Sequence, residues 1–140
     1  MIRVIYRILL LLSLVILASC SGTGTKTSLL YNEVNTEKTK IFIKRSTGLA
    51  GVAVLIKVKL NDTILGELGE NEAFTAIPKV GFNTLRASFA IKSFLAASHG
   101  VNSFEIKEGE NLFFVIKQDM GVIRNKLKIY NVDKTNFFMD

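Results

Sequence analysis

The chain has 140 residues, with 18 basic against 12 acidic side chains and a formal net charge of +6. This length suits one domain and leaves little room for a second hydrophobic core. The single cysteine excludes an intrachain disulfide, so we expect the fold to depend on its apolar core. The lysines are spread along the sequence without a dense basic run or interleaved aromatic residues, which argues against a nucleic-acid partner.

The amino terminus has the parts of a bacterial secretory signal. Arg3 and Arg7 supply a positive start, and residues 8–17 are apolar apart from Ser13. This apolar run is shorter than the roughly 20 residues that span a bilayer comfortably. We predict that residues 1–19 form a signal-peptide helix that is removed, which leaves 16 basic and 12 acidic residues and a net charge of +4.

The four residues at the end of this segment resemble a lipobox, the sequence recognised by lipoprotein diacylglyceryl transferase and the lipoprotein signal peptidase. The resemblance implies signal peptidase recognition of Leu17, Ala18 and Ser19, cleavage before Cys20, and lipidation of Cys20 with acyl chains such as palmitate. Two or three such chains hold a protein on a membrane far more firmly than one. The alternatives are a secretory signal with an incidental cysteine and an uncleaved anchor helix.

The next residues predict a tether and a location. Residues 20–39 comprise the lipidated cysteine and a linker, of which Ser21 to Ser28 is polar, contains glycine and is expected to be flexible. Residues 29–39 could be a first turn or an irregular lead-in. No aspartate follows Cys20, a pattern that resembles lipoproteins exported to the outer membrane. We expect a protein of the bacterial cell envelope, partnered with the membrane through its lipid anchor, in the outer membrane facing the periplasm.

From Lys40 onward, apolar residues recur at every second position, which is typical of half-buried strands. Asparagine, glycine and proline mark turns at 61–62, 69–71 and 78, and residues 108–111 make a further turn. Phe94 to Asn102 interrupts the alternation and is interpreted as a loop, and little room remains for helix. The expected strands cover residues 40–45, 52–60, 63–68, 73–77, 82–92, 104–106, 112–117 and 127–132.

This pattern predicts an all-β fold over residues 40–140, a small antiparallel β-sandwich of about seven to eight strands, Ig-like or PEGA-like. Three stretches resemble the domains of unknown function of bacterial lipoproteins of the DUF2846 type, and also PEGA-like surface domains: Val58 to Leu68, Phe74 to Ile77, and Gly81 to Ala87. The resemblance implies a β-sandwich at the cell envelope and brings no catalytic residue. The chain departs from these families at Lys79 to Asn83, where they usually have Pro-Gly followed by a histidine or tyrosine.

Few residues could support chemistry. His99 is the only histidine, and with Cys20 assigned to lipid no second nitrogen or sulfur ligand remains for zinc. Two groups of glutamates surround turns, but neither has the spacing of a calcium loop, and glutamates beside turn glycines usually serve solubility. These groups are Glu67, Glu70 and Glu72, and Glu105, Glu108 and Glu110. We therefore predict no catalytic residues, no metal, no cofactor and no enzymatic activity.

Neighbouring aromatic residues give two further predictions. Phe113 and Phe114 adjoin in one strand and must face opposite sides, so that one is in the core and the other points outward or lies under a second layer. Residues 137–139 have the sequence Phe-Phe-Met and either dock against the domain or form an exposed tip, of which we favour docking.

Two functions fit these features. The first is a membrane-anchored, non-catalytic binding or structural module whose open sheet edge or loop rim contacts another envelope protein or a surface polymer. The alternative is a lipoprotein that holds a small apolar ligand or a lipid between its sheets. The packing of six apolar residues distinguishes the two functions: Val54, Ile56, Leu85, Phe89, Phe114 and Ile116. A cavity lined by these residues would favour the apolar-ligand function, and tight packing of them would favour the binding module.

Overall fold

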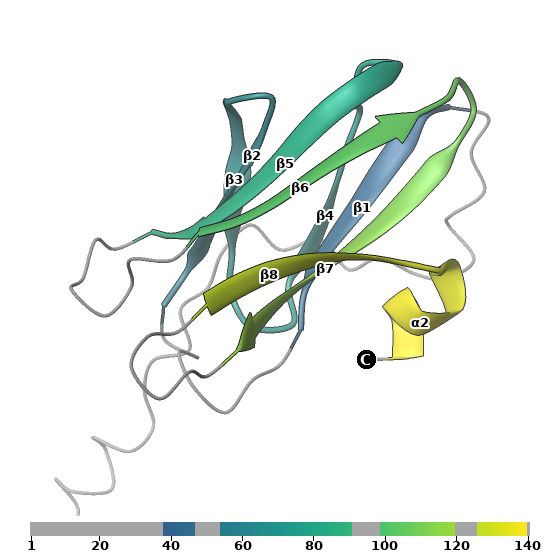
Figure 1. Ribbon diagram of the computed structural model, residues 1–140. Helices are drawn as coiled ribbons and strands as arrows, with labels where there is room; N and C mark the ends of the chain where they lie inside the picture. The colour runs from purple at the N-terminus through teal and green to yellow at the C-terminus, as the bar shows by residue number, and fades with distance from the viewer. Residues whose placement is uncertain (1–37, 47–53, 91–98, 120–125, 140) are drawn as a thin grey trace, which may run out of the picture.

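Two four-stranded sheets pack face to face in the computed structural model, which describes residues 38–46, 54–90, 99–119 and 126–139 (Figure 1). The first sheet has the order β4-β1-β7-β8, with β1 at Lys40–Arg45, β4 at Ala73–Ala76, β7 at Asn111–Asp119 and β8 at Lys126–Val132. The second has the order β3-β2-β5-β6, with β2 at Ile56–Leu60, β3 at Thr63–Leu68, β5 at Gly81–Phe89 and β6 at His99–Ile106. The predicted all-β sandwich is confirmed, whereas the predicted signal helix lies outside the described residues.

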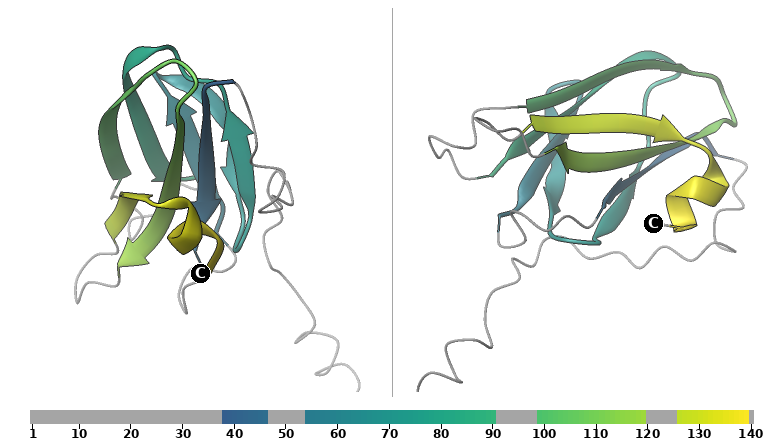
Figure 2. Two further views of the ribbon diagram at one scale, coloured as in Figure 1. Left: turned by 90° about the vertical axis from the view of Figure 1, so that its right-hand side faces the viewer. Right: turned by 60° about the horizontal axis from the view of Figure 1, so that its bottom comes forward.

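A short helix, α2 at Lys134–Met139, covers part of the outer face of the first sheet and lies beside β7 and β8 in both views of Figure 2. Its Phe137 is 1% exposed and packs with Phe42, Phe113 and Val115. The preferred docking of the carboxyl end is therefore confirmed for Phe137, although Met139 is exposed. The expectation that helix has little room missed α2, because its six residues carry too short a pattern to reveal a helical period.

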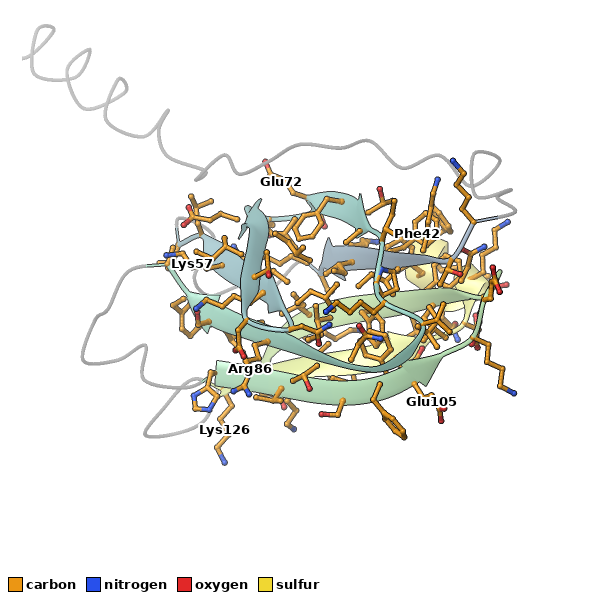
Figure 3. All side chains as sticks on the ribbon, turned by 90° about the horizontal axis from the view of Figure 1, so that it is seen from above. Phe42, Lys57, Glu72, Arg86, Glu105 and Lys126 are labelled. Atoms are coloured by element: carbon orange, nitrogen blue, oxygen red, sulfur yellow. The ribbon has the colours of Figure 1, made fainter. Side chains whose placement is uncertain are left out.

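Alternating side chains fill the space between the two sheets, as Figure 3 shows. Ile41 and Ile43 on β1 face Ile56 and Val58 on β2, and all four are fully buried. Phe114 belongs to this core, whereas Phe113 points the other way and lies under α2. The prediction that the two neighbouring phenylalanines face opposite sides is confirmed.

The predicted hairpin of β2 and β3 forms around residues with left-handed backbone. Asn61 and Asp62 have φ angles of 48° and 68°, and Asn71 has 56° in the turn between β3 and β4. Asparagine and aspartate tolerate this conformation better than other non-glycine residues, which explains their positions here. The turn places Leu60 opposite Thr63 and aligns β3 antiparallel to β2.

Three expectations about strands were wrong. β1 pairs with β7 in parallel, from Lys40 opposite Asn111 to Arg45 opposite Ile116, so the sandwich is not wholly antiparallel. Strand β2 begins at Ile56, and Val54 and Leu55 precede it. Strand β6 begins at His99, inside the stretch interpreted as a loop. In each case the partner strand decides the direction or the bounds of the strand, and local alternation does not identify that partner.

One long side of the sandwich is closed by contacts between the edge strands β6 and β8. The side chain of Asn102 donates a hydrogen bond of 3.0 Å to the carbonyl of Ile129. A Cβ atom on Gly100 would lie only 3.0 Å from the carbonyl oxygen of Leu127, so glycine permits this approach. On the other side, β3 and β4 each have a strand neighbour on one side only within the described residues, which leaves this side open.

Candidate functional site

The predicted lipidation and signal peptidase residues, Leu17, Ala18, Ser19 and Cys20, lie outside the described residues. Within the part that the structure describes, no helix is long and apolar enough to cross a membrane. The candidate site residues described below belong to the sandwich and to the helix that follows it.

The titratable groups considered from the sequence have structural neighbours. His99 is exposed at the start of β6, opposite Ser88 on β5. Glu72 accepts a hydrogen bond of 2.7 Å from the backbone N–H of Gly69, and Glu110 accepts one of 2.8 Å from that of Lys107, so each closes its own turn. In the described ranges, no group of three or more His, Cys, Asp or Glu side chains could hold a metal ion.

Arg45 is a buried cation that the sequence analysis did not single out. Its side chain is 4% exposed, and Nη1 donates to the carbonyls of Val54 at 2.6 Å and Leu68 at 3.3 Å. Burial lowers the pKa of this guanidinium, while the charges of Glu70 and Glu72 act in the opposite direction. The contacts join β1 to the residues just before β2 and to the end of β3, which is a structural role.

A second buried polar residue, Asn83, organises the opposite end of the sandwich. Its Nδ2 donates to the carbonyls of Lys79 at 2.7 Å and Gly81 at 2.9 Å, and its Oδ1 accepts from Asn61 Nδ2 at 2.8 Å. Asn61 in turn accepts from the backbone N–H of Thr84 at 2.9 Å. Gly81 has a φ of 101°, which an L residue rarely adopts. These bonds hold the connection between β4 and β5 against the β2–β3 turn.

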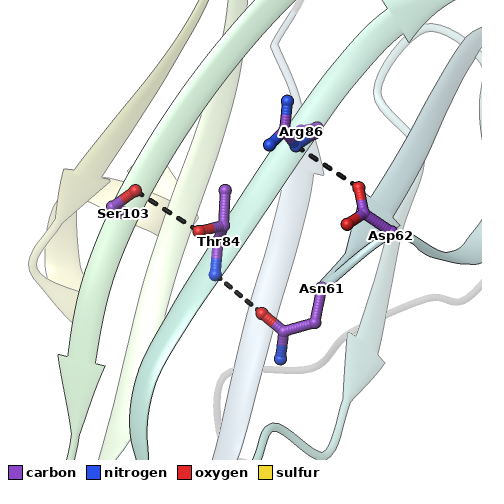
Figure 4. A network of polar contacts seen from close by, with 5 residues as sticks. All are labelled: Asn61, Asp62, Thr84, Arg86 and Ser103. Atoms are coloured by element: carbon purple, nitrogen blue, oxygen red, sulfur yellow. Dashed lines mark hydrogen bonds and ion pairs between the residues drawn. The ribbon is translucent and has the colours of Figure 1, made fainter.

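The same network continues across the outer face of the second sheet, as Figure 4 shows. Asp62 pairs with Arg86 at 3.6 Å, and the hydroxyls of Thr84 and Ser103 lie 3.4 Å apart. These side chains are partly or fully exposed, so each pair contributes little to stability. Their effect is to align β5 with the β2–β3 turn and with β6.

Three large apolar side chains are exposed on residues 77–82, the connection from β4 into β5 that this network holds in place. Ile77 is 73% exposed, Val80 63% and Phe82 83%, and we call these three residues the apolar rim. Single exposed apolar residues are ordinary on protein surfaces, whereas a group of them is a candidate contact site. The segment ends in β5, where Phe82 lies opposite Glu105.

A hollow of about 230 Å³ lies beside the rim on the open side of the sandwich. Its lining comes from the β2–β3 hairpin and from the residues after β4, namely Leu60, Asn61, Thr63, Leu65, Ile77 and Lys79. Its lining is largely apolar, which suits the binding of an apolar side chain or an extended segment.

The sequence held a signal for part of this site. Phe82 has the same parity along β5 as Thr84 and Arg86, so strict alternation already places a large aromatic ring on the solvated face. The hollow had no such signal, because its lining is brought together from separate strands only by folding.

Comparisons with known proteins name no family for this chain. No family model matches the sequence, and no curated protein matches it either. Among solved structures, the chain is similar to one described as the NMR structure of the protein from Eubacterium rectale, with 18% sequence identity and a TM-score of 0.42. The match covers 68% of this chain and 88% of the other.

Proposed function

We propose that the protein is a membrane-anchored lipoprotein of the bacterial cell envelope whose β-sandwich is a non-catalytic binding module. Cys20 carries the lipid, residues 21–39 tether the domain, and the open β3–β4 side of the sandwich receives another envelope protein or a surface polymer. The observation that carries this proposal is the hollow beside an edge strand, since an extended segment can pair with β3 while one of its side chains enters the hollow.

The asymmetry of the sandwich supports the choice of side. Gly100 and Asn102 bring β6 close to β8, and the Asn102 side chain bonds the carbonyl of Ile129, so these two edges partly cover each other. Strand β3 keeps one edge without a strand neighbour among the described residues, and its Thr63 and Ile64 are exposed. An open edge offers backbone donors and acceptors in a regular row, which is the basis of strand addition.

The resemblance of the stretches between Val58 and Ala87 to DUF2846-type and PEGA-like domains agrees with this proposal, because it implies a β-sandwich at the cell envelope and brings no catalytic residue to transfer. We propose the outer membrane, with the domain facing the periplasm, as the location. The alternative function, an apolar ligand between the sheets, has less support. Ile56, Leu85, Phe114 and Ile116 have no exposed surface and pack in one cluster, with Phe89 against it.

Two measurements on the full chain test this proposal. Labelling with a palmitate precursor and mass spectrometry should find acyl chains on Cys20, and the Cys20→Ala variant should take up no label. A photo-crosslinking residue at Ile64 should then yield one defined adduct in intact envelopes, while the same residue at Tyr130, on the outer face of the first sheet, should yield none.

A matched pair of threonine substitutions identifies the hollow as the binding site. Thr63 lines the hollow and Thr135 on α2 is exposed away from the open side, so both accept an arginine without disturbing the core. Thr63→Arg should reduce the adduct about tenfold, equivalent to about 1.4 kcal/mol of binding free energy, and Thr135→Arg should leave it unchanged. Equal adducts in the two variants would contradict the proposed site, and an unlabelled Cys20 would contradict the anchor.

A further inference from the structure

We propose that the apolar rim, Ile77, Val80 and Phe82, rests in the surface of the bilayer to which Cys20 tethers the domain. This inference rests on the proposed lipid anchor and adds an orientation to it. The rim exposes more apolar side chain in six residues than any other stretch of the described chain of that length, and its three side chains are 73%, 63% and 83% exposed. Aliphatic and aromatic side chains gain by leaving water for the boundary between headgroups and acyl chains.

The tether joins the domain at the same end of the sandwich as the rim. The described chain begins at Lys38 and enters β1 at Lys40. Thr39 accepts a hydrogen bond of 2.8 Å from the backbone N–H of Gly109, and Lys40 N–H donates to the carbonyl of Glu110 at 3.2 Å. Both partners belong to the β6–β7 turn, which follows directly after Ile106.

Ile106 lies opposite Gly81, the residue between Val80 and Phe82. The start of β1, the β6–β7 turn and the rim therefore share one end of the sandwich, the end that lies uppermost in Figure 1. A chain anchored through its amino-terminal side attaches to the bilayer at the end that carries the rim.

The length of the tether makes this contact possible without forcing it. Seventeen residues lie between Cys20 and Lys38, and a flexible chain of that length would have a mean span of about 25 Å. Since the tether keeps the domain within this distance of the lipid, even a weak apolar contact becomes intramolecular and is populated.

The charges at this end indicate the kind of surface. Four lysines and four carboxylates are distributed over it, so net attraction to anionic headgroups is small: Lys38, Lys40, Lys79 and Lys107, and Asp62, Glu105, Glu108 and Glu110. The contact is therefore apolar, and the lysine stems extend from it toward the headgroups. It should form on zwitterionic lipid and persist at high salt.

The rim is also held in place for such a contact. Asn83 binds the carbonyls of Lys79 and Gly81, and Pro78 is buried between the exposed Ile77 and Lys79. The exposed side chains cannot turn inward without breaking these contacts, so ordering them on a bilayer costs little conformational entropy.

The absence of tryptophan from the sequence permits a direct test. Phe82→Trp and Val101→Trp each give the full lipidated chain a single indole, and Val101 serves as control because it is 46% exposed on the same outer face. Val101 precedes Glu105, the partner of Phe82, by four residues, about 13 Å along β6. The proteins are reconstituted into phosphatidylcholine vesicles with brominated acyl chains and checked by flotation.

The Phe82→Trp protein should show blue-shifted emission and lose most of it to the brominated lipid, also at 1 M salt, where the screening length is about 3 Å. The Val101→Trp protein should keep its emission. If both proteins float with the vesicles and neither is quenched, the orientation is wrong while the anchor stands. If they do not float, the anchor itself fails and the orientation fails with it.

Discussion

The side-chain amide of Asn61 donates a hydrogen bond of 2.8 Å to the side-chain oxygen of Asn83, across 22 residues of sequence. This bond joins the β2–β3 turn to the start of β5, and Asn83 is only 3% exposed. Because a buried amide must have its hydrogen-bonding groups satisfied, the pair ties the position of the rim to the stability of the hairpin turn.

Replacing Asn83 should destabilise this end of the domain. Asn83→Ala removes two bonds to backbone carbonyls and leaves Nδ2 of Asn61 without its acceptor, at a cost of about 1–3 kcal/mol in the free energy of unfolding. The measurement is denaturant unfolding in mild detergent, with Asn131→Ala, an exposed site on β8, as control within about 0.5 kcal/mol. Equal losses for both variants would contradict this role.

Phe137 should contribute far more to stability than its neighbour at the end of α2. Phe137 is 1% exposed with its ring centre 5.4 Å from that of Phe113, whereas Met139 is 75% exposed. We expect Phe137→Ala to cost about 3–5 kcal/mol, since it empties a packed site. Met139→Ala should change stability by less than about 0.5 kcal/mol in the same thermal or denaturant assay. A small effect of Phe137→Ala would mean that α2 is not packed as described.

Replacing Gly100 with alanine should destabilise the domain. The added Cβ of Gly100→Ala would meet the carbonyl oxygen of Leu127 at 3.0 Å and Cγ1 of Ile129 at 3.2 Å, so β6 and β8 must separate. The expected cost is about 1–3 kcal/mol. Hydrogen exchange should show faster exchange of β8 amides, and Ser103→Ala on the exposed face of β6 should not have this effect. Unchanged protection in Gly100→Ala would argue against the close approach.

An exposed ion pair on β7 and β8 gives a prediction about pH. The hydrogen bond from Lys128 to Asp119, followed by the charge of Asp119, raises the pKa of Lys128 above its ordinary value. Because the folded state favours the charged lysine, the stabilisation is complete below the ordinary lysine pKa and is lost as pH rises through the raised pKa. Asp119→Asn should lower the pKa of Lys128 in an NMR titration, and Asp133→Asn should not. Identical titrations with and without Asp119 would refute the pairing.

Several parts of the fold could be predicted because their causes are local. The alternation of Ile56, Val58 and Leu60 identifies the buried face of β2, and Asn61 and Asp62 supply the left-handed backbone of the hairpin turn. The opposite orientation of Phe113 and Phe114 follows from strand geometry alone. The candidate site was harder to predict from the sequence, since only the position of Phe82 on the outward face of its strand indicated an exposed aromatic residue.

By itself, the sequence determined the position of most strands, the turns between them and which of their side chains face the core, because these depend on neighbours a few residues away. Only the tertiary structure decided that β1 pairs in parallel with β7, that His99 to Asn102 belong to β6, and that Asn83 and Asn61 meet. Those outcomes depend on contacts between segments far apart in the chain. Their free energy comes from burial and pairing that local patterns do not specify.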